Sequence, residues 1–155
     1  MRRIVLALGV VVLAACAKKE PEPEVVVEVP APAPAPAPVV DLAMVAGTWD
    51  MQVMGATSDS VLTTYTLNAT STTEGWMMML PKRPPLALRV TVSGDSIMSE
   101  APEYESVLRK GVKVRTMSVF HVNGSSMTGT TTAHYTINGA DSVVMLRSSG
   151  TRKPM

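Results

Sequence analysis

A predicted β-hairpin in the second half of the chain constrains the fold more than any other sequence feature. Over residues 112–122, apolar and small side chains alternate with charged and bulky polar ones. A period of two indicates a β-strand with one buried face and argues against an amphipathic helix. Asn123-Gly124 follows directly, and this pair suits a type I′ turn, in which both central residues have φ > 0. We therefore expect a second strand over residues 126–136, paired with the first.

The same period of two recurs throughout the chain beyond residue 40 and predicts eight strands. The predicted strands are residues 47–54, 60–69, 74–80, 86–92, 96–101, 112–122, 126–136 and 142–149. Asn138-Gly139 marks the last turn in the same way as Asn123-Gly124. The longest connection, residues 102–111, is expected to hold one helical turn around residues 105–110.

Short sequential strands joined by tight turns predict an all-β domain built as an antiparallel meander. Eight strands are enough to close into a barrel, whose interior is filled by side chains or holds one small ligand. Closure also removes the unpaired edges of an open sheet. A closed barrel is therefore favoured, while an open sheet and a two-sheet sandwich remain alternatives because the loop spacing does not separate them.

The first predicted strand begins with Gly47-Thr48-Trp49, which resembles the Gly-x-Trp signature of lipocalins and their calycin relatives. The resemblance covers three residues, and the family's other short signatures and its C-terminal helix are not evident. In that family the tryptophan packs at the closed end of the barrel, under an arginine from a late strand. The resemblance thus implies a lipocalin-like barrel closed by Trp49 and Arg147, with Arg152 as the other candidate arginine.

The N-terminus has the pattern of a secretory signal. Met1-Arg2-Arg3 is basic, and residues 4–15 form an apolar run that is too short to cross a hydrocarbon core of roughly 30 Å as a helix. The run ends in Leu13-Ala14-Ala15-Cys16, which resembles the lipobox of bacterial lipoproteins. In that family the cysteine receives a diacylglycerol, cleavage follows before it, and the new amine is usually acylated. An ordinary signal peptide with an incidental cysteine is the alternative.

The lipobox resemblance implies three segments: a cleaved signal peptide over residues 1–15, a lipidated Cys16 followed by a tether to residue 40, and a β domain over residues 41–155. Two or more acyl chains, palmitate among them, make a stable membrane anchor. Ala17 stands where an aspartate would favour retention at the inner membrane. We therefore expect a lipid-anchored protein of the cell envelope, at the outer membrane if the host is Gram-negative.

The tether is expected to be extended, because proline alternates with alanine over residues 30–38 and excludes both helix and sheet. A polyproline II conformation at about 3.1 Å per residue gives residues 17–40 a reach on the order of 70 Å. The tether is either a spacer that lifts the domain off the bilayer or a linker whose length is not selected.

Composition excludes several classes of function. The formal charge is +1, and removal of Arg2 and Arg3 with the signal peptide lowers it to −1. Nucleic-acid binding needs a basic face, so we expect no nucleic-acid partner. Cys16 is the only cysteine, which allows no internal disulfide and leaves the β domain without thiol chemistry.

Two groups of residues resemble metal sites but are interpreted otherwise. The run Met77-Met78-Met79 offers thioethers, which suit Cu(I), but neighbouring strand residues point to opposite faces, so packing is the favoured role. His121 and His134 lie at unequal distances from the hairpin turn and cannot be cross-strand partners. We therefore expect no metal site and no cofactor.

Two charged segments are also candidates for chemistry. Glu100, Glu103 and Glu105 cluster before the long connection, where a carboxylate pair could serve acid–base catalysis. The stiff basic loop of residues 81–85 could contact anionic headgroups or a partner. A solvated acidic loop and a solvated strand connection are the favoured interpretations, and without a nucleophile, base or metal set we expect no enzyme.

Two classes of function remain for the β domain. It either binds a small hydrophobic ligand in its interior, or has a filled core and contacts an envelope protein through its surface. In the first case the lining is expected to include the aromatic residues and one methionine of the predicted inner face: Trp49, Met51, Tyr65, Trp76 and Tyr135. A cavity of a few hundred Å³ would favour the ligand-binding class.

Overall fold

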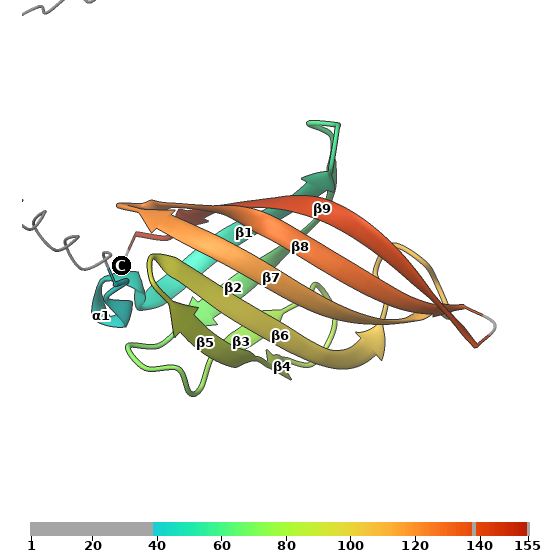
Figure 1. Ribbon diagram of the computed structural model, residues 1–155, viewed down its shortest axis with the longest axis horizontal. Coiled ribbons are helices and arrows are strands. Elements are labelled where there is room, and N and C mark those ends of the chain that lie inside the picture. Colours follow the sequence, from blue (N-terminus) through green and yellow to red (C-terminus); the bar gives the residue numbers. More distant parts are fainter. Residues whose placement is uncertain (1–38, 138, 155) are drawn as a thin grey trace, which may run out of the picture. The chain divides into compact units, whose positions relative to one another are not determined.

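The computed structural model describes residues 39–137 and 139–154, and these form one short helix and nine antiparallel strands (Figure 1). Cys16, the signal peptide and most of the tether lie outside the described residues. The elements are α1 (Leu42–Val45), β1 (Gly47–Gly55), β2 (Val61–Ala69), β3 (Met77–Met79), β4 (Leu86–Ala87), β5 (Arg89–Ser93), β6 (Ser96–Glu105), β7 (Lys113–Asn123), β8 (Ser126–Ile137) and β9 (Ala140–Arg152).

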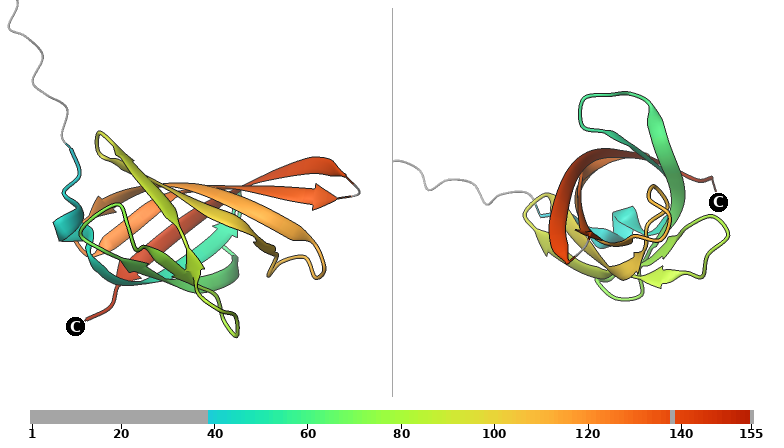
Figure 2. Two further views of the ribbon diagram at one scale, coloured as in Figure 1. Left: turned by 90° about the horizontal axis from the view of Figure 1, so that it is seen from below. Right: turned by 90° about the vertical axis from the view of Figure 1, so that its right-hand side faces the viewer.

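All nine strands belong to one sheet, in the order β4-β3-β2-β1-β9-β8-β7-β6-β5. Neighbours in this order are neighbours in the chain except β1 and β9, which pair from Trp49↔Arg152 to Gly55↔Leu146. The sheet therefore curls into a nearly closed barrel, seen end-on in Figure 2. The predicted all-β meander is confirmed, and a barrel rather than an open sheet or a sandwich is formed.

The ninth strand arises because the predicted strand over residues 86–92 is split at Leu88. Its first part, β4, pairs with β3, and its second part, β5, pairs with β6. The two parts thus form the two edges of the sheet, and Leu88 donates its amide to the carbonyl of Trp76 at 2.9 Å. The gap between the two edge strands, β4 and β5, is therefore crossed by the chain at Leu88 and is not closed by a ladder of hydrogen bonds.

Helix α1 covers one end of the barrel (Figure 1). Asp41 caps it, because its carboxylate accepts the amide of Ala43 at 2.9 Å. The indole of Trp49 donates to the carbonyl of Val45, the last helical residue, at 3.0 Å. Val40, which was expected to end the tether, already hydrogen-bonds to Gly94, so the fold begins at least one residue earlier than the sequence predicts.

The interior next to α1 is completely filled. Trp49, Trp76 and Phe120 are fully buried there, in one cluster with Met51. Phe120 lies over Gly129, where a Cβ atom would stand 2.1 Å from the carbonyl oxygen of Val119 and 2.8 Å from the Phe120 ring. These residues form a plug, and the cavity described below lies in the half of the barrel farther from α1.

The long connection differs from its prediction. β6 continues through Glu105, and residues 107–110 make bends and a turn, so the predicted helical turn over residues 105–110 is wrong. The connection is short because Tyr104 and Glu105 still pair with β7, beyond a bulge that follows Ala101. None of the helices in residues 39–137 and 139–154 is long and apolar enough to span a bilayer.

Candidate functional site

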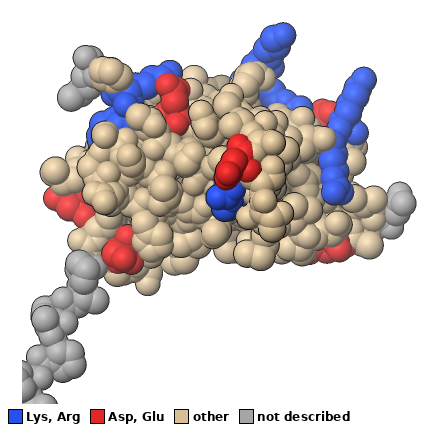
Figure 3. All heavy atoms as spheres, turned by 90° about the horizontal axis from the view of Figure 1, so that it is seen from above, with Lys and Arg blue, Asp and Glu red and all other residues tan. Residues whose placement is uncertain are grey.

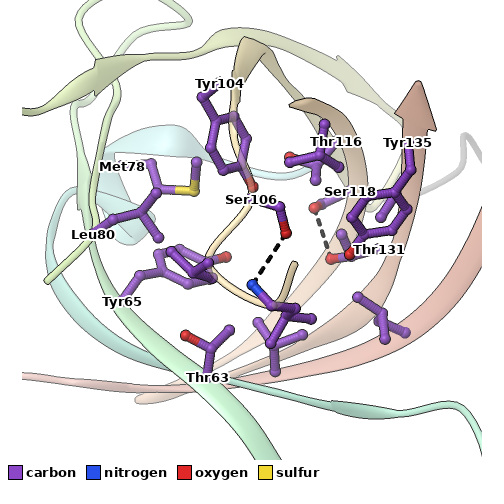
Figure 4. Close-up of a pocket in the computed structure, with 16 residues that line it drawn as sticks. Thr63, Tyr65, Met78, Leu80, Tyr104, Ser106, Thr116, Ser118, Thr131 and Tyr135 are labelled. Carbon is purple, nitrogen blue, oxygen red and sulfur yellow. Dashed lines mark hydrogen bonds between the residues drawn. The ribbon is translucent and has the colours of Figure 1, made fainter. Parts of the chain in front are cut away.

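A cavity of about 50 Å³ lies inside the barrel, beyond the plug (Figure 4). Its walls come from β1, β2, β3 and β6 to β9, and the loop of residues 106–111 covers it. An engineered apolar cavity that binds benzene measures roughly 150 Å³, three times as much. The cavity is also far smaller than the few hundred Å³ that would favour a carrier of a hydrophobic ligand.

Three tyrosines stand in the cavity wall: Tyr65, Tyr104 and Tyr135 (Figure 4). The hydroxyls of Tyr65 and Tyr104 point towards the middle of the cavity. Burial raises the pKa of Tyr65, and the neighbouring Tyr104 raises it further. Burial also raises the pKa of Tyr104, partly offset by a hydrogen bond with Thr116. Both phenols therefore stay neutral at physiological pH.

The floor of the cavity is a chain of three buried hydroxyls. Ser118 and Thr131 face each other across β7 and β8, with their side-chain oxygens 2.8 Å apart. Thr131 also bonds to Ser148 of β9 at 2.8 Å. All three residues are less than a tenth exposed, and Ser118 and Thr131 line the cavity. A line of polar groups thus separates the filled half of the barrel from the open half.

The loop that covers the cavity, which we call the lid loop, consists of residues 106–111. Its first residue, Ser106, is buried and accepts the amides of Leu108 and Arg109 on its hydroxyl, both at 3.0 Å. Val107 and Leu108 line the cavity, although each is more than a third exposed. The loop is therefore one tight turn with two apolar side chains over the cavity.

Two arginines hold the lid loop in place. Arg83, from the connection between β3 and β4, donates to the carbonyls of Glu105 and Ser106. Arg109 lies over the ring of Tyr135, with its Cζ 4.4 Å from the ring centroid. The basic loop of residues 81–85 thus has a structural role that its sequence did not indicate.

The structure divides the five residues that the sequence singled out as ligand-lining or core. Tyr65 and Tyr135 line the cavity. Trp49, Met51 and Trp76 belong to the filled half and are at most 1% exposed. The division follows from depth along the barrel, which a period of two does not reveal because it only separates inside from outside.

The predicted closing pair of Trp49 and Arg147 is wrong. Arg152 lies over Trp49, while Arg147 is bound on the outside to Asp59, with 2.7 Å between Nη2 and Oδ1. Arg147 does share its face of β9 with Val143 and Met145, but that face is the outer one, since both apolar residues are more than half exposed. The cross-strand register Trp49↔Arg152 decides the partner.

The other candidate groups are not brought together. His121 lies 3.7 Å from Asp95 and His134 lies 2.9 Å from Asp141, at opposite ends of the same hairpin. Of the run Met77-Met78-Met79, only Met78 is buried. Across residues 39–137 and 139–154, no three His, Cys, Asp or Glu side chains are grouped closely enough to hold a metal ion.

The acidic residues before the lid loop are also separated. Glu103 pairs with Lys113 at 2.9 Å, and Glu105 accepts the amide of Gly111 at 3.2 Å. Glu100 stands opposite Arg89 in the sheet. Glu103 thus links β6 to β7, and Glu105 binds the backbone of the lid loop. No two of the three carboxylates face a shared cavity.

Sequence reasoning missed Tyr104, the hydroxyl floor and the lid loop. The alternation over residues 112–122 puts Ser118 on the same face as the apolar residues of that strand, so the sequence itself indicates a polar side chain at an inward position. Tyr104 was hidden because its strand was expected to end at residue 101. Comparisons with protein-family models, with curated protein sequences and with solved structures give no match to this chain.

Proposed function

We propose that this chain is a lipid-anchored protein of the cell envelope, whose β-barrel binds one compact ligand in the cavity beneath the lid loop. The observation that carries the proposal is the cavity itself: a pocket with apolar walls and converging hydroxyls, covered by a loop. Ligand sites have this composition, mostly apolar with a few placed polar groups. The volume restricts the ligand to a small molecule, well below the size of a fatty acid.

Native mass spectrometry tests ligand binding on the intact mature chain, purified from its own host in mild detergent. We expect a small-molecule adduct that is lost when Ala133→Leu fills the cavity, because Ala133 is buried in its wall. Ala87→Leu is the matched control, since Ala87 is exposed on β4. An unliganded mass in every preparation, or an adduct that survives Ala133→Leu in a folded protein, contradicts the proposal.

The membrane anchor is supported by the sequence at residues 1–16 alone, and it has its own test. Replacement of Cys16 by serine removes the thiol that would form the thioether. We expect the variant to leave the membrane fraction or to remain unprocessed. Unchanged partitioning and unchanged electrophoretic mobility would exclude lipidation at this residue.

A second candidate function, docking to an envelope protein, is favoured by the outer face of β7 to β9. Met117 and Met145 flank Thr132 in one cross-strand row, and Val143 lies beside them. The two methionines are 44% and 60% exposed, and with Val143 they form a contiguous exposed apolar patch, which is the kind of surface that marks interaction sites. The face drawn in Figure 3 is mostly uncharged, with charges of both signs dispersed over it.

Crosslinking in the envelope separates the two candidates. A photoreactive residue in place of Met145 should capture a defined protein if this face docks, and the same residue in place of the exposed Arg89 should not. Equal labelling at both positions contradicts a specific docking face.

A further inference from the structure

We propose that the cavity takes an uncharged ligand of a few non-hydrogen atoms, which hydrogen-bonds through a hydroxyl or carbonyl group to the chain Ser118–Thr131–Ser148. This inference rests on the proposed ligand-binding function and adds the chemical class of the ligand. Three properties of the site carry it: the number of protons in the hydroxyl chain, the absence of charge in the lining, and the depth of the floor.

The proton count leaves one donor without a partner inside the chain of hydroxyls. Each hydroxyl has one proton, so Ser118, Thr131 and Ser148 have three protons between them. The two bonds of the chain use two of these protons. The third proton belongs to whichever residue ends the chain, and a buried donor is stabilised by an acceptor.

The direction of the hydrogen bonds among the three hydroxyls decides whether the ligand meets a donor or an acceptor. If Ser148 donates to Thr131 and Thr131 donates to Ser118, the remaining proton is on Ser118, which lines the cavity. If the chain runs the other way, Ser118 offers only lone pairs to the cavity. Rotation of three hydroxyl protons therefore converts the floor from a donor for a carbonyl to an acceptor for a hydroxyl.

The lining excludes a charged ligand group from the floor. None of the described residues that line the cavity is Asp, Glu, Lys, Arg or His. Arg83 donates to the carbonyls of Glu105 and Ser106, and Arg109 of the lid loop lies over the Tyr135 ring, so neither arginine is part of the lining. A buried charge without a partner is costly by several kcal/mol, so the buried part of the ligand is neutral.

The depth of the floor and the free volume limit the ligand to a few non-hydrogen atoms. Below the hydroxyls, Phe120 lies over Gly129, and the thioether of Met51 lies where a Cβ of Gly150 would be, at 2.3 Å. A longer apolar chain cannot pass this plug. The free space of about 50 Å³ is a third of the roughly 150 Å³ of an engineered apolar cavity that binds benzene, so a six-membered ring does not fit. Tyr65 and Tyr135 can pack against the short apolar part of such a ligand.

Methyl NMR with three probes tests this inference on the intact mature chain in detergent micelles, with methionine methyl groups labelled. Methanol carries a hydroxyl, ethane lacks it, and formate carries a charge. Met78 in the cavity wall reports on binding, and the exposed Met145 reports on nonspecific contact. We expect methanol to shift Met78 but not Met145, and to bind at least about fivefold more tightly than ethane, with no binding of formate.

Two variants locate the selectivity. Ser118→Ala should lower the preference for methanol over ethane about fivefold, because the floor loses the hydroxyl that faces the cavity. Thr63→Val is the matched control, because Thr63 also lines the cavity but lies on β2, away from the floor. It should leave the preference unchanged. Dispersed methyl spectra establish that each variant is folded, and Ser118→Thr, which restores a hydroxyl, should recover the preference.

The outcomes distinguish the two proposals. If none of the three probes shifts Met78, ligand binding in this cavity fails as a whole. If methanol and ethane bind equally, if formate binds as well as methanol, or if Thr63→Val lowers the preference as much as Ser118→Ala, then the cavity binds ligands but the hydroxyl floor does not select them.

Discussion

Arg152 covers Trp49 at the closed end of the barrel, with its Cζ 4.5 Å from the ring centroid. The same guanidinium donates to the carbonyls of Ala46, at 2.5 Å, and Met44. It therefore joins the last strand, the first strand and the end of α1. The last carbonyls of a helix have no partner within the helix. A cation placed there accepts this role by donating to them, and it also interacts favourably with the negative end of the helix dipole.

Replacement of Arg152 by alanine is expected to lower the free energy of unfolding by about 2–3 kcal/mol. The variant loses a cation–π contact of about 0.5–2 kcal/mol and two charge-assisted hydrogen bonds. Arg147→Ala is the control: Arg147 pairs with Asp59 and donates to the carbonyls of Gly55 and Ser58, all on the outer face, so its loss should cost only about 1 kcal/mol. Urea unfolding monitored by tryptophan fluorescence measures both, and a larger loss in Arg147→Ala contradicts the assignment of Arg152.

The alternation in the sequence largely distinguishes inward-facing from outward-facing residues, but it does not show how far along the barrel each residue lies. On β1 the predicted inner residues Trp49, Met51 and Val53 are all buried, because alternation directly reflects the pleat. On β9 the apolar residues Val143 and Met145 suggest an inner face that also holds Arg147, but both are exposed and this face is the outer one. Apolar side chains on an outer face are common, so their presence alone does not identify the inner one.

The candidate site depended on contacts that local patterns do not contain. The hydroxyl floor joins residues from three strands, and only the register places Ser118, Thr131 and Ser148 side by side. The length of β6 was also unpredictable, because Pro102 argues against a continuing strand. A bulge between residues 101 and 104 accommodates that proline, and Tyr104 thereby reaches the cavity.

Gly129 should tolerate no side chain, because the Phe120 ring and the backbone of β7 occupy the space of its Cβ. We expect Gly129→Ala to lower the free energy of unfolding by about 2–3 kcal/mol, since a close-packed interior must shift to admit it. At Gly55 a Cβ would stand 3.5 Å from Ser58, which is ordinary contact. Gly55→Ala should therefore change stability by less than about 1 kcal/mol in the same urea titration, and equal losses would argue against the plug.

Stability should fall at alkaline pH because of Tyr65. Its pKa is raised above the ordinary value of 10.0 by burial, so the folded protein keeps a proton that the unfolded chain releases. Below pH 10 both states are protonated and the contribution is constant. Above pH 10 the unfolded state binds fewer protons, so each pH unit lowers stability by up to about 1.4 kcal/mol. Urea unfolding across this range should show a shallower decline for Tyr65→Phe, and identical slopes contradict the prediction.

The contact between Arg109 and Tyr135 should control how often the lid loop opens. Arg109→Ala removes a cation–π contact worth about 0.5–2 kcal/mol, so local opening of the loop becomes roughly 3- to 30-fold more frequent. Amide hydrogen exchange should accelerate by that factor at position 109 and at Val112. The first amide donates to the Ser106 hydroxyl and the second to the carbonyl of residue 109. Exchange in β8 should stay unchanged, because its ladders with β7 and β9 do not involve this side chain.

Lys110→Ala is the matched control for the lid loop, since Lys110 is exposed on the same turn and its replacement removes an equal charge. It should leave exchange at Arg109 and Val112 within about twofold of the unmodified protein, because an exposed lysine contributes little to stability. If both variants accelerate exchange equally, the charge of the loop matters and the Tyr135 contact does not. If only Arg109→Ala does so, access to the cavity is governed by one residue of the loop and one residue of the wall.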